Sequence, residues 1–270
     1  MQPAILVILE KVETAWATLA TAALLRQRLA PAASVTVLHI RHDPMEGFMP
    51  SEEVMTSRHR HLLQQAADAG SVAIRAVFDH WQASHPDARW TERTGETAAV
   101  VRAAVAASDL VVLSRPVAGQ TRQALHILLF AARTLTLVAP GSPPPSMGRH
   151  AVVAWKDDEP ARRVLHQALP LLRRSGAVTL LIGQESPADL TEEPAWLVQA
   201  LTAADIPVDI RVVPLHGQPI GDVLREQVRA IGADLLVMGA YGHSRLRELI
   251  LGGATRSVLL DAAVPVLLQH

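Results

Sequence analysis

Glycines near the C-terminus of the chain have a spacing that could hold a phosphate group. The stretch GAYGHSRLRELILGG begins at Gly239, has its second glycine at Gly242, and ends on the pair Gly252 and Gly253. Glycine lets the backbone approach a ligand closely, and N–H groups in such a loop or at a helix N-terminus bind anions. Glycines are also common in turns and where helices pack on strands. The spacing therefore leaves two interpretations open, a phosphate cradle and a packing motif.

Polar side chains inside this stretch could add donors to the same site. His243, Ser244 and Arg245 follow the second glycine, and all three side chains can donate hydrogen bonds. The sequence ATRSVLL, which starts at Ala254, predicts a second helix directly after the double glycine. Two sets of backbone N–H groups could therefore converge on one polyphosphate.

A repeated pattern along the chain predicts the elements that position these residues. DLVVLS at 109–114 and DLLVMG at 234–239 each follow an alanine-rich helical stretch. ILVILEKVE, from Ile5, and VVAWKDDE, from Val152, each run from an apolar strand into a polar turn and a helix. Apolar strands that alternate with helices indicate βαβ units and a buried parallel sheet with helices on both faces. We therefore predict an α/β protein with about five strands in each half.

The two halves meet at a segment that cannot continue a helix. The stretch APGSPPPSMGR is rich in proline, glycine and serine, as expected of a domain joint. We predict a domain at 1–140, a linker at 141–149 and a second domain at 150–270. The first half carries an additional helical segment around 51–80, whose histidines, His59 and His61 among them, are expected on a solvated face rather than in a metal site.

Composition excludes several classes of protein. The 270 residues carry a formal net charge of −1, which argues against an electrostatic nucleic-acid binder. The chain has no cysteine, so disulfides, thiol catalysis and thiolate zinc sites are excluded. We expect no signal peptide, because MQPAILVILEKVE lacks a basic start and a cleavage site, and no membrane span, because no apolar run is long enough. A cytoplasmic location fits these observations.

The C-terminal half resembles the universal stress protein family. Nucleotide-binding members of that family carry G-x2-G-x9-G followed by Ser or Thr, and Gly239, Gly242 and Gly252 fit this spacing. The surrounding sequence at 232–268 is similar to the family as well. With the weaker first copy, the resemblance extends over nearly the whole chain and identifies it as a tandem, UspA-like member.

This resemblance implies a fold and a mode of pairing. It implies two tandem Rossmann-like domains of the adenine nucleotide alpha hydrolase-like type. Each would be a five-stranded parallel sheet of order 3-2-1-4-5 with helices on both faces. The last strands commonly mediate dimer contacts, so the halves would form an internal pseudo-dimer, and further pairing of chains into a homo-oligomer stays open.

The resemblance also implies a ligand, ATP or a related nucleotide with Mg, held at the ends of strands 1 and 4 of the second half. The implied contacts there are Ala154, Lys156, Asp157, Gly239, Gly242, His243, Ser244, Gly252, Gly253 and Ala254. The sequence departs from the family pattern in two places. Gly253 replaces the Ser or Thr, and Lys156 stands where relatives have an adenine-recognising aspartate. Either Asp157 takes over that role, or Lys156 favours phosphate; Trp155 beside them is expected in the core rather than stacked on a base.

The first half lacks the glycine motif. Glu10 stands at its aspartate-like position, while Ser114 and Val117 replace the first two glycines. Pro116 removes a backbone donor from the loop, and the apolar residues 128–130 lie where a third glycine would be sought. We therefore expect this half to be a structural partner that binds no nucleotide.

Three functions remain open on the sequence. The first is a stress-response or regulatory module that binds ATP; slow hydrolysis stays open, but we predict no catalytic residues, because no Walker or kinase signature is present. The second is an interaction or dimerisation module that does not bind nucleotide, with an unidentified protein partner. The third is a binder of another small anion, with Lys156 and Arg245 as the positive groups. No metal site is predicted in the protein itself.

Overall fold

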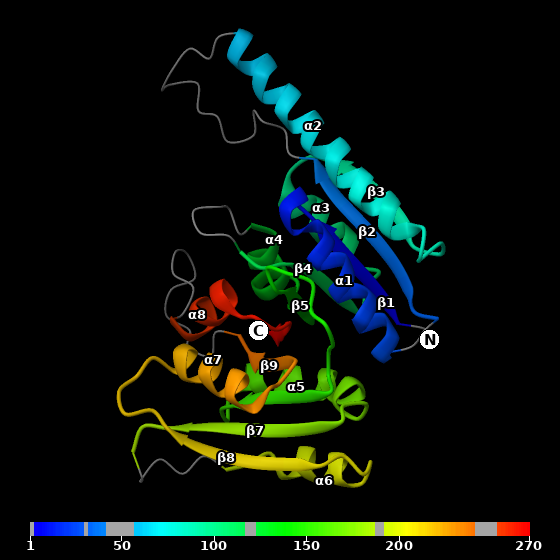
Figure 1. Ribbon diagram of the computed structural model, residues 1–270. Helices are drawn as coiled ribbons and strands as arrows, with labels where there is room; N and C mark the ends of the chain where they lie inside the picture. The colour runs from blue at the N-terminus through cyan, green and yellow to red at the C-terminus, as the bar shows by residue number, and fades with distance from the viewer. Residues whose placement is uncertain (1–2, 30–31, 42–56, 117–122, 187–191, 241–252) are drawn as a thin grey trace.

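The computed structural model describes the fold over residues 3–29, 32–41, 57–116, 123–186, 192–240 and 253–270. Its strands form one ten-stranded sheet in the order β3-β2-β1-β4-β5-β10-β9-β6-β7-β8 (Figure 1). The strands of the N-terminal half are β1 (Ala4–Leu9), β2 (Ser34–Arg41), β3 (Arg89–Thr94), β4 (Leu110–Ser114) and β5 (Thr136–Ala139). Those of the C-terminal half are β6 (His150–Trp155), β7 (Ala177–Gln184), β8 (Val208–Pro214), β9 (Leu235–Gly239) and β10 (Val266–Gln269).

Each half has the predicted parallel order 3-2-1-4-5. The inner strands are buried on both faces: Val7 and Val112 in the first half, and Val153 and Val237 in the second, are fully buried. β-Branched side chains suit such a pleated surface that is covered on both sides. This arrangement explains why the sequence of these strands is continuously apolar rather than alternating.

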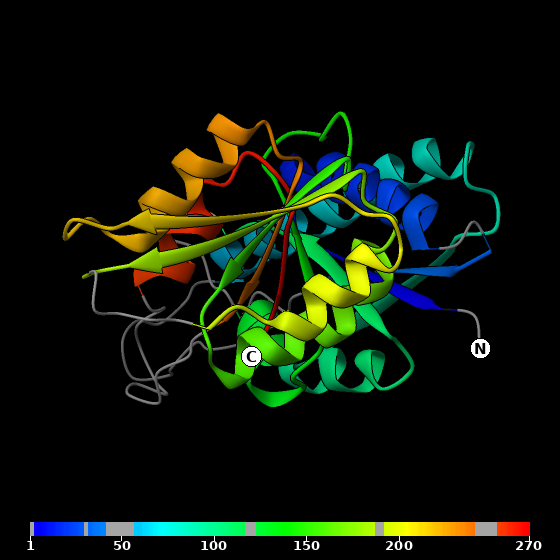
Figure 2. The ribbon, with the colours of Figure 1, turned by 90° about the horizontal axis from the view of Figure 1, so that it is seen from below.

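Helices cover both faces of the sheet. One apolar core receives side chains from α1 (Val12–Leu29), α2 (Ser57–Gln82), α5 (Glu159–Leu172) and α6 (Ala195–Thr202). The other core receives side chains from α3 (Thr97–Val105), α4 (Gln123–His126), the π-helical turn η1 (Ile127–Ala131), α7 (Ile220–Ile231) and α8 (Gly253–Asp261). Figure 2 shows the strands fanning out around the centre of the sheet, as the right-handed twist of strands requires.

The halves join through an antiparallel pair of strands. Val138 of β5 lies opposite Val266 of β10, and Leu137 lies opposite Leu267. The pairing expected between last strands is therefore formed within the chain, and it merges the two five-stranded sheets into one. The connecting segment also packs: Met147 is only 1% exposed, because its side chain lies in the core shared by the two halves.

In each half, one aspartate forms the same pair of hydrogen bonds with the first residue of the first strand. The N–H of Ala4, the first residue of β1, donates to Asp109, and the N–H of His150, the first residue of β6, donates to Asp234. The backbone N–H of each aspartate donates back to the carbonyl of the same partner. The repeated DLVVLS and DLLVMG sequences thus have repeated structural roles.

The helical segment predicted around 51–80 is not an addition to the fold. It is α2, which connects β2 to β3 as α6 connects β7 to β8, and it has 26 residues where α6 has 8. His59 and His61 lie on its exposed part. Among the residues that the structure describes, no group of acidic and histidine side chains is arranged to hold a metal ion.

Candidate functional site

The predicted site lies at the carboxyl end of β6, where the direction of strand progression reverses. β7 pairs with one side of β6 and β9 with the other. Ligands of open α/β sheets bind outside the carboxyl ends of strands at such a switch point. We call this region, formed by the ends of β6 and β9 and the start of α8, the C-terminal rim.

The end of β6 presents one buried and two exposed side chains. Trp155 is 6% exposed, and its indole Nε1 donates to the carbonyl of Glu192 at 2.7 Å. The expectation that Trp155 belongs to the core is therefore confirmed. Lys156 and Asp157 follow on the surface, so the turn after β6 carries one ammonium group and one carboxylate at the rim.

Asp157 already has a partner in the protein. Its Oδ1 accepts from the Arg162 side chain, at 2.8 Å from Nε and 2.6 Å from Nη2. The carboxylate side chain keeps 42% of its surface exposed, so it can still be reached from solvent. An adenine amine would have to share this carboxylate with Arg162.

The start of α5 is capped by its own sequence. Asp158 is the N-cap residue, and its Oδ1 accepts from the N–H of Ala161 at 3.0 Å. Pro160 stands in the first turn and has no N–H. The carboxylate occupies the place that an anion would take at an uncapped helix, so α5 is unsuited to hold a phosphate.

Gly239 is required by packing. A Cβ at this position would lie 2.6 Å from the backbone nitrogen of Ala161 and 3.0 Å from the carbonyl carbon of Pro160. Only glycine allows the first turn of α5 to approach the end of β9 so closely. The packing interpretation of this glycine is thus established by geometry, whether or not a ligand also uses it.

The residue after Gly239 has no free backbone group. The N–H of Ala240 donates to the carbonyl of Gln269 at 2.8 Å, and its carbonyl is 2.9 Å from Nδ1 of His270. Backbone donors for a phosphate must therefore come from further along the loop or from α8.

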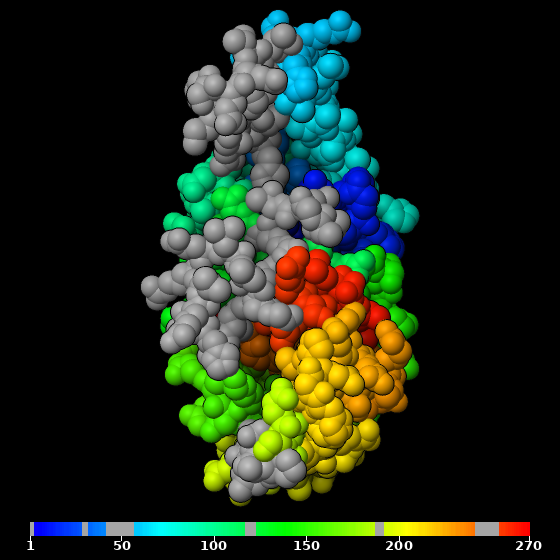
Figure 3. All heavy atoms as spheres, turned by 90° about the vertical axis from the view of Figure 1, so that its left-hand side faces the viewer, coloured from blue at the N-terminus to red at the C-terminus, as the bar shows by residue number. Residues whose placement is uncertain are grey.

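α8 begins at Gly253, the second glycine of the pair and one residue before the predicted start at Ala254. Its first turn packs against the first turn of α7, where a Cβ on Gly221 would lie 2.8 Å from the carbonyl of Ala254. Ser257 donates to Asp222 of α7 at 2.7 Å, and Figure 3 shows the red α8 against the orange α7. The bond from Ser257, followed by the one from Arg225, lowers the pKa of Asp222.

The rim brings together six of the ten predicted contacts. Ala154, Lys156 and Asp157 come from the end of β6, Gly239 from β9, and Gly253 and Ala254 from the start of α8. The remaining predicted contacts lie outside the described residues, as does the further donor Arg245; these residues are Gly242, His243, Ser244 and Gly252.

The corresponding rim of the N-terminal half is organised differently. Burial raises the pKa of Glu10, the residue after β1, and the nearby Lys11 offsets only part of this effect. Arg115, which follows β4, donates from Nη1 to the carbonyl of Leu260 at the end of α8. The side chain after the fourth strand thus connects the two halves in this part of the sheet.

One detail of the sequence comparison between the halves is wrong. Leu128 and Leu129 were expected where a third glycine would stand, but they are buried in the π-helical turn that continues α4. Gln123 lies 13 positions before Thr136, the first residue of β5, and Gly253 lies 13 positions before Val266, the first residue of β10, so Gln123 is the counterpart of Gly253.

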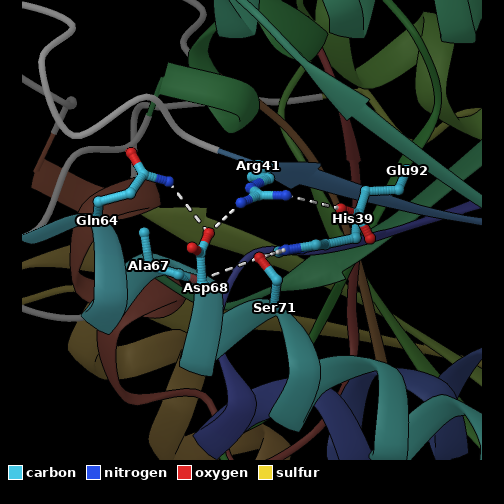
Figure 4. Close-up of polar contacts among 7 residues, drawn as sticks. All are labelled: His39, Arg41, Gln64, Ala67, Asp68, Ser71 and Glu92. Carbon is cyan, nitrogen blue, oxygen red and sulfur yellow. Dashed lines mark hydrogen bonds and ion pairs between the residues drawn. The ribbon is translucent and has the colours of Figure 1, made fainter.

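Sequence inspection missed a polar cluster between β2 and α2 (Figure 4). His39 is 4% exposed; its Nδ1 is 2.9 Å from the carbonyl of Leu9, and its Nε2 is 3.0 Å from Oγ of Ser71. Since a carbonyl only accepts, Nδ1 carries the proton. Arg41 forms an ion pair with Asp68 beside this histidine. Only the polar residues His39 and Arg41 at the end of β2 could have signalled the cluster.

A groove of about 470 Å³ lies next to this cluster. One face of α2 forms most of its wall, and Arg41 and Glu92 complete it from the strands. Arg75 in the wall is bonded to Asp79 at 2.8 Å, and its guanidinium lies over the rings of Phe78 and Trp90. Both arginines of the groove are thus paired with carboxylates, which gives an anion little positive charge to bind.

The fold defines the chain as a twisted α/β protein of the Rossmann-like class, with a topological switch point at the end of β6 in its second half. Residues 147–270 match the model of the universal stress protein family. Residues 147–270 therefore carry a domain of the universal stress protein family.

Individual relatives agree with this assignment. Universal stress protein Slr1230 of Synechocystis is 56% identical over 34 residues, which span 13% of this chain and 12% of the length of that relative. The crystal structure of a universal stress protein from Archaeoglobus fulgidus has a TM-score of 0.66 at 14% identity, covering 98% of this chain and 94% of that one. A functionally unknown protein from Pseudomonas aeruginosa gives 0.54 at 13% identity, with coverages of 98% and 92%. These two structures establish that the fold extends over both halves.

Within the described ranges, no helix combines the length and the apolar character needed to cross a bilayer.

Proposed function

We propose that this chain is a tandem universal stress protein that binds ATP or a related nucleotide, with Mg, at the C-terminal rim. In this proposal the nucleotide-binding domain is 150–270, and 1–140 is a structural partner joined to it by 141–149. The protein acts as a cytoplasmic stress-response module whose conformation or partners depend on the bound nucleotide.

The observation that carries the proposal is the convergence at the rim. The close approach of α5 to Gly239 holds the end of β6 beside the end of β9. α8 covers the opposite face of the sheet from α5, but it starts at the same carboxyl edge, against the first turn of α7. The family motif runs between Gly239 and Gly253, so a ligand held by that loop would lie among these elements.

The described residues suggest how such a ligand would be held. The first N–H groups of α8, at Gly253 and Ala254, would face phosphate oxygens, because helix N-termini favour negative charge. Lys156 would add a positive charge, and Asp157 is the rim carboxylate nearest to it in the chain. Mg would be bound mainly by the nucleotide phosphates, as is usual for this ion.

Thermal unfolding of the full chain with and without MgATP tests this proposal. At a ligand concentration of 100 times Kd, binding should stabilise the protein by about 2.7 kcal/mol. Gly242→Val should abolish this shift, and Lys156→Ala should weaken binding about tenfold by removing a charge-assisted contact. Lys11→Ala is the matched control in the N-terminal half and should leave the shift unchanged. Absence of a shift at millimolar MgATP would refute nucleotide binding.

A second candidate function is an interaction module without a nucleotide. It is favoured because two backbone N–H groups at the rim are already bonded within the protein. The N–H of Ala240 donates to the carbonyl of Gln269, and the N–H of Ala161 at the start of α5 donates to Asp158. In this case the glycines serve packing, and no thermal shift occurs. A third candidate, binding of a simple anion, predicts that inorganic polyphosphate stabilises the protein as well as ATP does, whereas AMP does not.

A further inference from the structure

The strand β8 forms one edge of the sheet and has no neighbour beyond it among the described residues (Figure 1). Two apolar side chains on it are exposed, Ile210 at 38% and Val212 at 54%. The opposite edge, β3, has no large apolar side chain of this kind in the described chain, and its exposed residues include Arg89 and Arg93. Charged side chains on an edge oppose pairing with other chains. β8 also carries charges, Asp209 and Arg211, but its exposed apolar side chains make it the less protected of the two edges.

The hydrogen bonds to β7 determine which backbone groups of β8 face outward. The N–H of Val178 donates to the carbonyl of Pro207 at 2.9 Å, and the N–H of Leu215 donates to Gln184 at the far end. In a parallel ladder, alternate residues of one strand bond to the same neighbour. The odd-numbered residues of β8 therefore bond to β7, and the N–H and C=O groups of Val208, Ile210 and Val212 point away from the sheet.

We propose that β8 pairs with β8 of a second copy of this chain, antiparallel, about a two-fold axis at Ile210. This register places the two Ile210 residues opposite each other and Val208 opposite Val212. All three are the residues whose backbone groups face outward, so each can exchange N–H···O=C bonds with its opposite number. Pro214 has no N–H, and the ladder ends before it.

The charges of β8 are complementary in this register. Asp209 of one copy lies opposite Arg211 of the other, and the same pair forms again across the axis. These are the positions without cross-strand backbone bonds, where opposed side chains come closest. Within one chain the two side chains pair at 2.6 Å but keep 54% and 48% of their surface exposed, so both remain accessible to a partner.

The apolar side chains also match. Val208, Ile210 and Val212 lie on one face of β8, as alternate residues of a strand do, and pairing would join two such rows. An extended segment of another protein could also use the outward backbone groups, but it would not require a strand whose charges complement themselves about its own centre. The self-complementary order Asp-Ile-Arg therefore favours a second copy, in an isologous contact.

Sedimentation velocity of the full chain, with two charge-reversal variants, tests this interface. Asp209→Arg places arginine opposite arginine, and Arg211→Glu places carboxylate opposite carboxylate. Each variant alone should dimerise about tenfold more weakly than the wild type, because two attractive pairs become repulsive. An equimolar mixture should form a heterodimer of near wild-type affinity, since both cross-strand pairs are then of opposite charge.

Two substitutions on α7 that change the net charge by the same amounts are the control. Glu226→Arg and Arg229→Glu replace exposed side chains and should leave dimerisation unchanged, and thermal unfolding should show that all four variants are folded. A monomeric wild type, single variants that dimerise normally, or a mixture that stays monomeric would each overturn the proposal. If β8 pairs with a different protein and not with a second copy, the wild type should sediment as a monomer.

Discussion

Arg28 and Arg174 donate hydrogen bonds to each other's backbone carbonyl, with Nη1–O distances of 3.0 Å and 2.8 Å. Arg28 lies in the last turn of α1 and Arg174 follows α5. The two arginines are 146 positions apart, as are Ala4 and His150, the first residues of β1 and β6. A reciprocal contact between equivalent residues is what a two-fold relationship between the halves produces.

Arg28 should contribute measurably to the stability of this joint. Its Nε also donates to the carbonyl of Met147 at 2.8 Å in a partly buried bond, so Arg28→Ala removes this bond as well as the exposed one to Arg174. We expect a loss of about 1–2 kcal/mol in the free energy of unfolding, measured by urea denaturation. Arg173→Ala, at an exposed neighbouring position, is the control, with an expected change within about 0.5 kcal/mol. Equal effects of the two variants would show that the joint does not depend on Arg28.

Asp109 and Asp234, which bond the first residues of β1 and β6, should differ in their contribution to the free energy of unfolding. Asp234 accepts from Oγ of Ser146 at 2.6 Å and from the N–H groups of Arg149 and His150, each at 3.1 Å. Asp109 accepts one described bond, from the N–H of Ala4. We expect Asp234→Ala to cost about 2–3 kcal/mol and Asp109→Ala about 1 kcal/mol. Denaturant midpoints in the reverse order would contradict this ranking.

Gly239 should be essential for stability even without a ligand. Gly239→Ala brings a Cβ within 2.6 Å of the Ala161 backbone, and such overpacking costs about 1–3 kcal/mol. Gly70→Ala is the matched control: it lies inside α2, nothing surrounds its Cβ position within 4 Å, and alanine should stabilise by about 0.5–1 kcal/mol. Thermal unfolding of the two variants should therefore shift in opposite directions. A neutral Gly239→Ala would leave ligand binding as the remaining reason for this glycine.

Glu10 should make stability depend on pH. Burial raises the pKa of Glu10 in the folded protein, so its contribution is complete below the ordinary value of 4.5 and is lost as pH rises through the folded value. Glu10→Gln removes this loss. Relative to wild type, the variant should gain stability as pH rises above about 4.5 and then reach a plateau. Glu13→Gln, at an exposed position of α1, controls for the removed charge, and a difference independent of pH would contradict the expectation.

The fold could be predicted from the sequence because its signals are local and repeated. The apolar runs of β4 and β9 and the aspartates before them mark equivalent strands in both halves. The strand order followed from the family resemblance, and it is confirmed. The sequence predicts α2 as an addition to the fold, because its 26 residues hide its equivalence to the 8-residue α6. The two helices are equivalent because each connects the second strand of its half to the third.

The candidate site could be predicted only in outline. Spacing identified Gly239, but not that α5 packs against it, because Ala161 is distant in sequence. The bond between Asp157 and Arg162 and the cap at Asp158 likewise depend on side-chain directions that a sequence does not fix. His39 was missed for the same reason: its partners, Leu9 and Ser71, lie 30 and 32 positions away.

Isothermal titration of the full chain with MgATP tests the central claim most directly, because it counts sites as well as detecting binding. We expect one site per chain, since the rim of the second half carries the glycine motif, whereas the fourth strand of the first half ends on Ser114 and is followed by Arg115 and Pro116. Absence of binding heat at millimolar MgATP, or two sites per chain, would contradict this account.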